Sequence, residues 1–136
     1  MLLTIEKVIF LKSVDIFSKL PEESLVEVAT NLKELDISAE QQIFKKGDFG
    51  SSMYIIASGK VRLHDGERTF AILEEKQVFG LLAALDPESR VVTATAVEET
   101  HLFRIDQEPL YDLISDSTEI ARGIIHFLCQ RLRQKH

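Results

Sequence analysis

The sequence predicts a mixed α+β fold in which an antiparallel β-sandwich or barrel is flanked by helices. Three observations predict it. Apolar residues recur at helical intervals before Asp36, the period changes to two after it, and helical spacing returns after Asp106. Glycines at positions 47, 59 and 66 mark turns between short strands. A chain of 136 residues is long enough for one domain with one core.

Two helices are expected at the start of the chain. The first covers Thr4 to Phe17, where the apolar spacing is loose. The second begins at Pro21, which suits the first helical position because its missing N–H group would have no partner there. Its apolar residues lie three or four positions apart and should face the core: Leu25, Val28, Ala29, Leu32 and Leu35.

The clearest hairpin runs from Val61 to Phe70 around Asp65-Gly66, a dipeptide favoured in two-residue turns. Such a turn pairs Val61 with Phe70. It also places His64 on the face opposite Val61, so that one face is buried and the other meets water.

Two further segments, Met53 to Ala57 and Val91 to Val97, are apolar on both faces and should form central strands. A strand from His101 to Ile105 follows, and two helices end the chain. The last helix should be capped by Asp116, and its apolar stripe comprises Ile120, Ile124, Phe127, Leu128 and Leu132.

Composition excludes several classes of function. The formal net charge of −6 argues against direct nucleic-acid binding, and the basic cluster of Arg131, Arg133 and Lys135 suits the dipole of the last helix. The single cysteine, Cys129, cannot form an internal disulfide and fits a reducing compartment. No basic leader and no apolar run of about 18 residues occurs, so we expect a cytoplasmic chain without a membrane span. Whether the chain is part of a longer protein stays open.

Catalysis and metal binding have no basis in the sequence. The histidines at 64, 101, 126 and 136 lack the spacing of metal ligands, and neither a Gly-x-Ser-x-Gly elbow nor a P-loop occurs. We therefore expect a non-enzymatic chain without a cofactor.

The segment from Phe79 to Ala96 combines features of an anion pocket. A strand ends at Gly80, a short helical stretch follows, and Arg90 begins the next strand. Backbone N–H groups near Gly80 and the Arg90 guanidinium can converge on one anion. An ordinary loop arginine is the alternative interpretation.

These residues resemble the cyclic nucleotide-binding domain of catabolite-activator-type regulators, kinase regulatory subunits and gated channels. The Lys-Lys-Gly-Asp turn at 45–48 and the segment from Met53 to Val61 also match, so the resemblance covers about Leu11 to Leu132. It implies a single domain with a jelly-roll-like β-roll of about eight strands over residues 36–106. Helices at 1–35 and 107–136 would flank the roll, and residues 79–90 would form the phosphate-binding cassette.

The resemblance also assigns site residues. Gly80, Leu82 and Ala83 match the cassette, and Arg90 matches the arginine that pairs with the cyclic phosphate. The family has a glutamate that binds the ribose 2′-hydroxyl where this chain has Leu81. Val91 stands where a threonine favours cGMP in some members, so cAMP is expected rather than cGMP.

Two functions follow from these expectations. The first is a regulatory sensor that binds a cyclic nucleotide or another small anion and signals through the C-terminal helices. The second is a degenerate module, without a nucleotide, that mediates interaction or dimerisation. The partner in either case would be a second copy or an attached effector domain.

Overall fold

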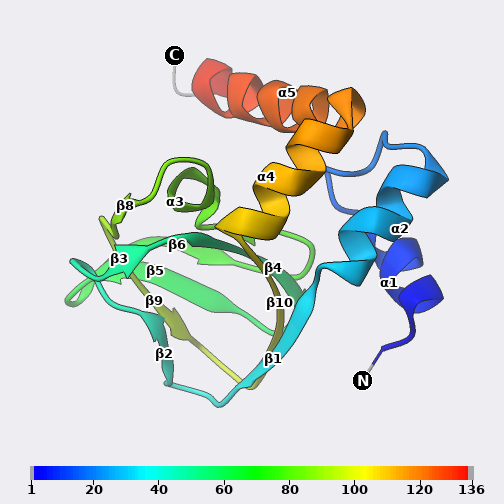
Figure 1. Cartoon of the computed structure of the whole chain (residues 1–136). Helices are drawn as coiled ribbons and strands as arrows, with labels where there is room; N and C mark the ends of the chain where they lie inside the picture. The colour runs from blue at the N-terminus through cyan, green and yellow to red at the C-terminus, as the bar shows by residue number, and fades with distance from the viewer. Residues whose placement is uncertain (1, 135–136) are drawn as a thin grey trace. The chain divides into compact units, whose positions relative to one another are not determined.

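The computed structural model describes residues 2–134, which form five helices and ten strands (Figure 1). The helices are α1 (Thr4–Leu11), α2 (Glu22–Thr30), α3 (Leu81–Leu85), α4 (Gln107–Asp116) and α5 (Thr118–Gln134). The strands are β1 (Lys33–Ile37), β2 (Gln42–Phe44), β3 (Phe49–Gly50), β4 (Ser52–Ser58), β5 (Val61–Asp65), β6 (Arg68–Leu73), β7 (Val78–Phe79), β8 (Glu88–Ser89), β9 (Thr93–Ala96) and β10 (Thr100–Asp106). The predicted α+β class is confirmed. There are more strands than the eight expected, but β3, β7 and β8 are only two residues long.

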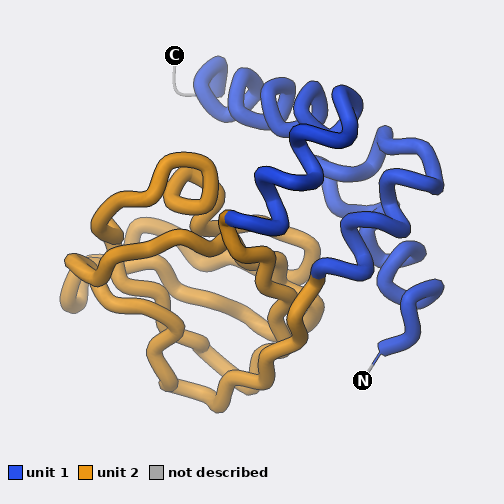
Figure 2. The backbone as a smooth tube through the Cα atoms, viewed as in Figure 1, with its two compact units in different colours: residues 1–31, 108–136 blue, residues 32–107 orange. Residues whose placement is uncertain are grey.

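The chain divides into two compact units (Figure 2). One unit joins the described residues up to Asn31 to those from Glu108 onward and contains α1, α2, α5 and nearly all of α4. The other unit, Leu32–Gln107, contains every described strand and α3.

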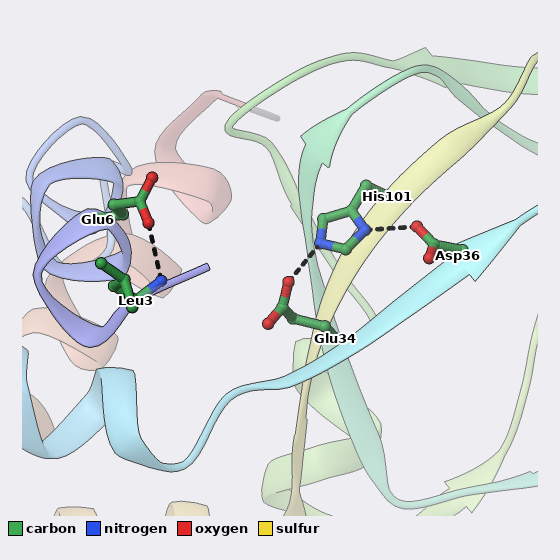
Figure 3. Close-up of polar contacts among 5 residues, drawn as sticks. All are labelled: Leu3, Glu6, Glu34, Asp36 and His101. Atoms are coloured by element: carbon green, nitrogen blue, oxygen red, sulfur yellow. Dashed lines mark hydrogen bonds and ion pairs between the residues drawn. The ribbon is translucent and has the colours of Figure 1, made fainter. Parts of the chain in front are cut away.

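The first helix is shorter than predicted. It ends at Leu11 instead of Phe17, and turns follow it. The Ser13 hydroxyl donates a hydrogen bond to the Phe10 carbonyl oxygen over 2.6 Å, which competes with continuation of the helix. At the other end, the Leu3 N–H group donates to a Glu6 carboxylate oxygen over 2.9 Å (Figure 3).

The second helix also ends early. Leu25, Val28 and Ala29 are buried as expected, but the helix ends at Thr30, so Leu32 and Leu35 lie beyond it. The Asn31 side-chain amide and the Thr30 hydroxyl both donate to the Glu27 carbonyl oxygen, each over 2.9 Å. These side-chain bonds satisfy the last turn and end the helix. Pro21 was predicted to be the first helical residue, but it is the N-cap, so the helix begins one residue later, at Glu22.

The two predicted C-terminal helices are present, but Asp116 is the last residue of α4 and does not cap α5. The cap is Ser117, whose hydroxyl oxygen accepts a hydrogen bond from the Ile120 N–H group over 3.3 Å. Ile120 and Ile124 are buried, whereas Leu132 is 61% exposed, so the expected stripe is only partly covered by described residues. Lys135 and His136 lie outside the described residues.

The strand unit contains two four-stranded sheets with the orders β1-β10-β4-β7 and β2-β9-β5-β6. A two-stranded ribbon pairs β3 with β8. Both predicted central strands lie between neighbours, β4 between β10 and β7 and β9 between β2 and β5. However, β9 begins at Thr93, and Val91 is 80% exposed. A buried cluster fills the interior: Tyr54, Ile56, Val61, Phe79, Ala94 and Leu102.

The predicted hairpin exists, but its predicted register was wrong. Val61 pairs with Leu73 and Asp65 with Arg68, so the two-residue turn is Gly66-Glu67. A bulge between Leu63 and His64 breaks the alternation of faces, and the His64 side chain is buried. Its ring nitrogens lie 2.8 Å from the Gly66 carbonyl oxygen and 2.7 Å from Thr95 Oγ1, which satisfies them in the interior.

We predict that Leu102→Ala lowers the free energy of unfolding by about 2–5 kcal/mol. Leu102 is fully buried, so its truncation removes apolar contacts and leaves a cavity. Ile72→Ala on the edge strand β6 is the control, because Ile72 is 48% exposed and should lose less than about 1 kcal/mol. Urea unfolding measures both values, and equal losses would contradict the assignment of the core.

Candidate ligand-binding site

The backbone of Arg90 is held by the turn at 45–48. The Arg90 N–H group donates to the Asp48 carbonyl oxygen over 2.6 Å, and the Gly47 N–H group donates to the Arg90 carbonyl oxygen over 2.8 Å. Next to this contact, β3 pairs with β8, which joins Phe49 to Ser89. Two segments that are distant in sequence therefore fix the position from which the Arg90 side chain projects.

The Arg90 side chain is only 8% exposed. Its Nη2 atom donates to the Ser52 carbonyl oxygen over 2.9 Å, and its Cζ atom lies 4.1 Å from the centre of the Phe44 ring. The Tyr54 ring, stacked on Phe79 at 5.1 Å, lies 5.9 Å from the same carbon. The guanidinium thus rests on aromatic rings and uses one backbone acceptor.

No carboxylate in residues 2–134 lies within ion-pair distance of this guanidinium. Burial lowers the pKa of Arg90, and the fields of Tyr54 and Asp48 only partly oppose that shift. Burying a charge costs free energy unless it is paired. The arrangement therefore leaves a buried cation whose compensation by described groups is incomplete.

Two glycines make room for this side chain. A Cβ atom on Gly50 would overlap Arg90 Nε, and one on Gly80 would lie 2.9 Å from Nη1. Gly80 also has a φ of 77°, which favours glycine. The structure thus places Gly80 beside the Arg90 guanidinium.

The other residues expected in the site differ in how much of each is exposed to solvent. Leu81, the first residue of α3, is buried at 5% exposure, whereas Leu82 is 70% exposed and Ala83 is half-buried. Val91 also faces solvent. Leu82 and Ala83 both belong to α3, the short helix whose N-cap, Gly80, lies beside Arg90.

Sequence reasoning missed Phe44, Gly50, Ser52 and Tyr54, which surround the guanidinium. Phe44 directly precedes the Lys-Lys-Gly-Asp turn at 45–48, so that turn offered a weak signal for it. Ser52 contributes a carbonyl oxygen, and main-chain groups leave no signature in a sequence.

Ser52 also connects Arg90 to an acidic group. Its hydroxyl donates to Asp106 Oδ1 over 2.7 Å, and Lys33 Nζ donates to Asp106 Oδ2 over 2.9 Å. Burial by itself would raise the pKa of Asp106, but the hydrogen bonds from Lys33 and Ser52 and the positive charges of Arg104 and Lys33 together outweigh it, so the pKa is lowered.

A second polar cluster lies between β1 and β10. His101 Nδ1 is 2.7 Å from Asp36 Oδ1, and His101 Nε2 is 3.0 Å from Glu34 Oε1 (Figure 3). The two carboxylates lie at different ring nitrogens of His101, so both cannot bind the same metal ion together with the ring. Across residues 2–134, no three His, Cys, Asp or Glu side chains are arranged to hold a metal ion.

The family model described as "Cyclic nucleotide-binding domain" matches residues 34–117. The cyclic AMP receptor protein of Thermus thermophilus is 40% identical over 97 residues, which cover 68% of this chain and 45% of that protein. The CRP-like cAMP-activated global transcriptional regulator of Mycobacterium tuberculosis is 30% identical over 124 residues, which cover 88% of this chain and 55% of that protein. The chain therefore spans about half the length of these curated relatives.

Solved structures agree with the sequence matches. The crystal structure of the Thermus thermophilus catabolite activator protein superposes with a TM-score of 0.81 and 31% identity, over 89% of this chain and 59% of that one. None of the helices in the described part of the chain is both long and apolar enough to cross a membrane.

We predict that Asp106→Asn lowers the free energy of unfolding at neutral pH by on the order of 1 kcal/mol. Because the pKa of Asp106 is lowered from 3.8 by folding, its stabilisation is present above that value and disappears as the pH falls through the folded-state pKa. The difference between variant and wild type should therefore narrow in acid. Urea unfolding at a series of pH values measures it.

Asp65→Asn is the control for this prediction, since it removes an exposed ion pair with Lys46 and should change stability much less at neutral pH. A difference for Asp106→Asn that is independent of pH would contradict the role of its charge.

Proposed function

This chain belongs to the cyclic nucleotide-binding domain family, and from that premise we propose that it is a non-catalytic regulatory domain with an anion site at Arg90. The proposed ligand is a cyclic nucleotide, cAMP rather than cGMP, whose phosphate pairs with the guanidinium. The names of two relatives, the cyclic AMP receptor protein of Thermus thermophilus and the cAMP-activated regulator of Mycobacterium tuberculosis, support this choice. The proposed location is the cytoplasm.

The buried guanidinium is the observation that carries the proposal. Arg90 is 8% exposed, keeps a single backbone acceptor in Ser52, and has no carboxylate partner among residues 2–134. An anionic ligand would supply the missing charge, and charge-assisted hydrogen bonds to a phosphate are among the strongest that proteins form. Main-chain N–H groups of Gly80, Leu82 and Ala83 would complete the site.

Selectivity and output are further parts of the proposal. Val91 has no hydroxyl, so it gives no preference for cGMP. The output would pass to α4, which follows β10 directly, and on to α5. Ile125 and Leu132 of α5 are not covered by other described residues, and such exposed apolar side chains suit contact with a second copy or an attached effector domain.

Leu81 favours a second candidate, a module that binds no nucleotide and acts in interaction or dimerisation. This side chain is buried and offers no acceptor for a ribose hydroxyl. In addition, the aromatic rings and Ser52 already give Arg90 structural contacts that need no ligand.

Titration with cAMP and cGMP distinguishes the two candidates. The first predicts heat with cAMP, weaker heat with cGMP, and loss of both in Arg90→Ala, because the phosphate loses its cation. Arg68→Ala is a matched control, since Arg68 also lies over a ring, that of Phe70 at 5.0 Å, but on β6. If folded protein gives no binding heat at millimolar nucleotide, the nucleotide-binding function is rejected and the module without a nucleotide is supported.

Leu81→Glu should increase cAMP affinity by roughly tenfold to a hundredfold, the value of one hydrogen bond to a charged group. The new carboxylate would accept the ribose hydroxyl. Calorimetry measures the affinity, and circular dichroism checks that replacing a buried leucine leaves the fold intact. Leu81→Gln is the uncharged control and should gain less. A folded Leu81→Glu variant with unchanged or weaker affinity would reject a ribose at this position.

A further inference from the structure

The unit that joins the described residues up to Asn31 to those from Glu108 onward is here called the helical unit. It contains a pocket of about 570 Å³ that is separate from the anion site at Arg90. It lies between the turns that follow α1 and one side of α5, from Glu119 to Gln134. Gly123 allows the two walls to approach, because a Cβ atom there would be 2.9 Å from the Ile16 carbonyl oxygen. The volume falls in the range of pockets that bind small molecules.

The lining includes both apolar and basic groups. Ile16 and Leu20 are buried residues that contribute apolar surface, and Phe127 is half-buried. The Arg131 guanidinium lies 4.6 Å from the centre of the Phe127 ring, so a cation is held against this apolar surface.

Lys19 and Arg122 are the other two lining residues with a fixed positive charge. Both are exposed, and neither they nor Arg131 form an ion pair with a carboxylate of residues 2–134. The acids in the lining are Asp15 and Glu119, so three cations face two carboxylates in a chain of net charge −6. The pocket is locally basic within an acidic protein.

We propose that this pocket binds a small organic carboxylate with an apolar body. The apolar part would cover Ile16, Leu20 and the Phe127 ring, and the carboxylate would pair with Arg122. Such a ligand would contact both α5 and the preceding turns, so its binding would stabilise the helical unit. The proposal does not depend on a nucleotide at Arg90.

Decanoate below its micellar concentration is the test ligand, with decanol as the uncharged chain and inorganic phosphate as the charge without a chain. Decanoate should raise the melting temperature by roughly 2–5 °C, and the two comparison compounds should have little effect. Arg122→Glu should weaken decanoate binding at least tenfold in calorimetry.

Arg133→Glu is the matched control, because Arg133 carries the same charge on the same helix but does not line the pocket. It should bind decanoate like the wild type, and so should Arg90→Ala. Equal shifts with decanol, equal weakening by both charge reversals, or no binding of decanoate to folded protein would each overturn the proposal.

Discussion

The guanidinium of Arg90 is a permanent charge placed where water hardly reaches it, and much of the strand unit is arranged around that placement. The turn at 45–48 holds its main chain, the Phe44 and Tyr54 rings lie near its Cζ atom, and Gly50 leaves space for its side chain. A residue with a Cβ atom at position 50 would collide with the side chain. These residues come from separate segments, so the site exists only when the sheets are assembled.

The sequence was sufficient for the fold class because apolar spacing reports burial directly. Met53 to Ala57 is apolar at every position, and only a strand covered on both faces suits such a run. The hairpin register could not be read in the same way. The turn falls at Gly66-Glu67 instead of Asp65-Gly66, and a bulge at Leu63-His64 then shifts the pairing by one further residue. The buried His64 depends on Thr95, thirty-one residues away.

The candidate site was predictable in part. Gly80 and Arg90 share one sequence motif, so their proximity could be expected. The orientation of Leu81 and Leu82 could not, because adjacent residues of a short helix point in different directions, and packing decides which is buried. The same limit applies to the pocket of the helical unit, whose walls lie about a hundred residues apart in the chain.

The ribbon formed by β3 and β8 has only two residues on each side and stands apart from both four-stranded sheets. Short, solvent-accessible pairings of this kind break with a small fraction of the free energy that global unfolding requires. The pairing of β3 with β8 is therefore expected to open more readily than the pairings within the two four-stranded sheets. The amide protons of this ribbon should therefore belong to the fast-exchanging class.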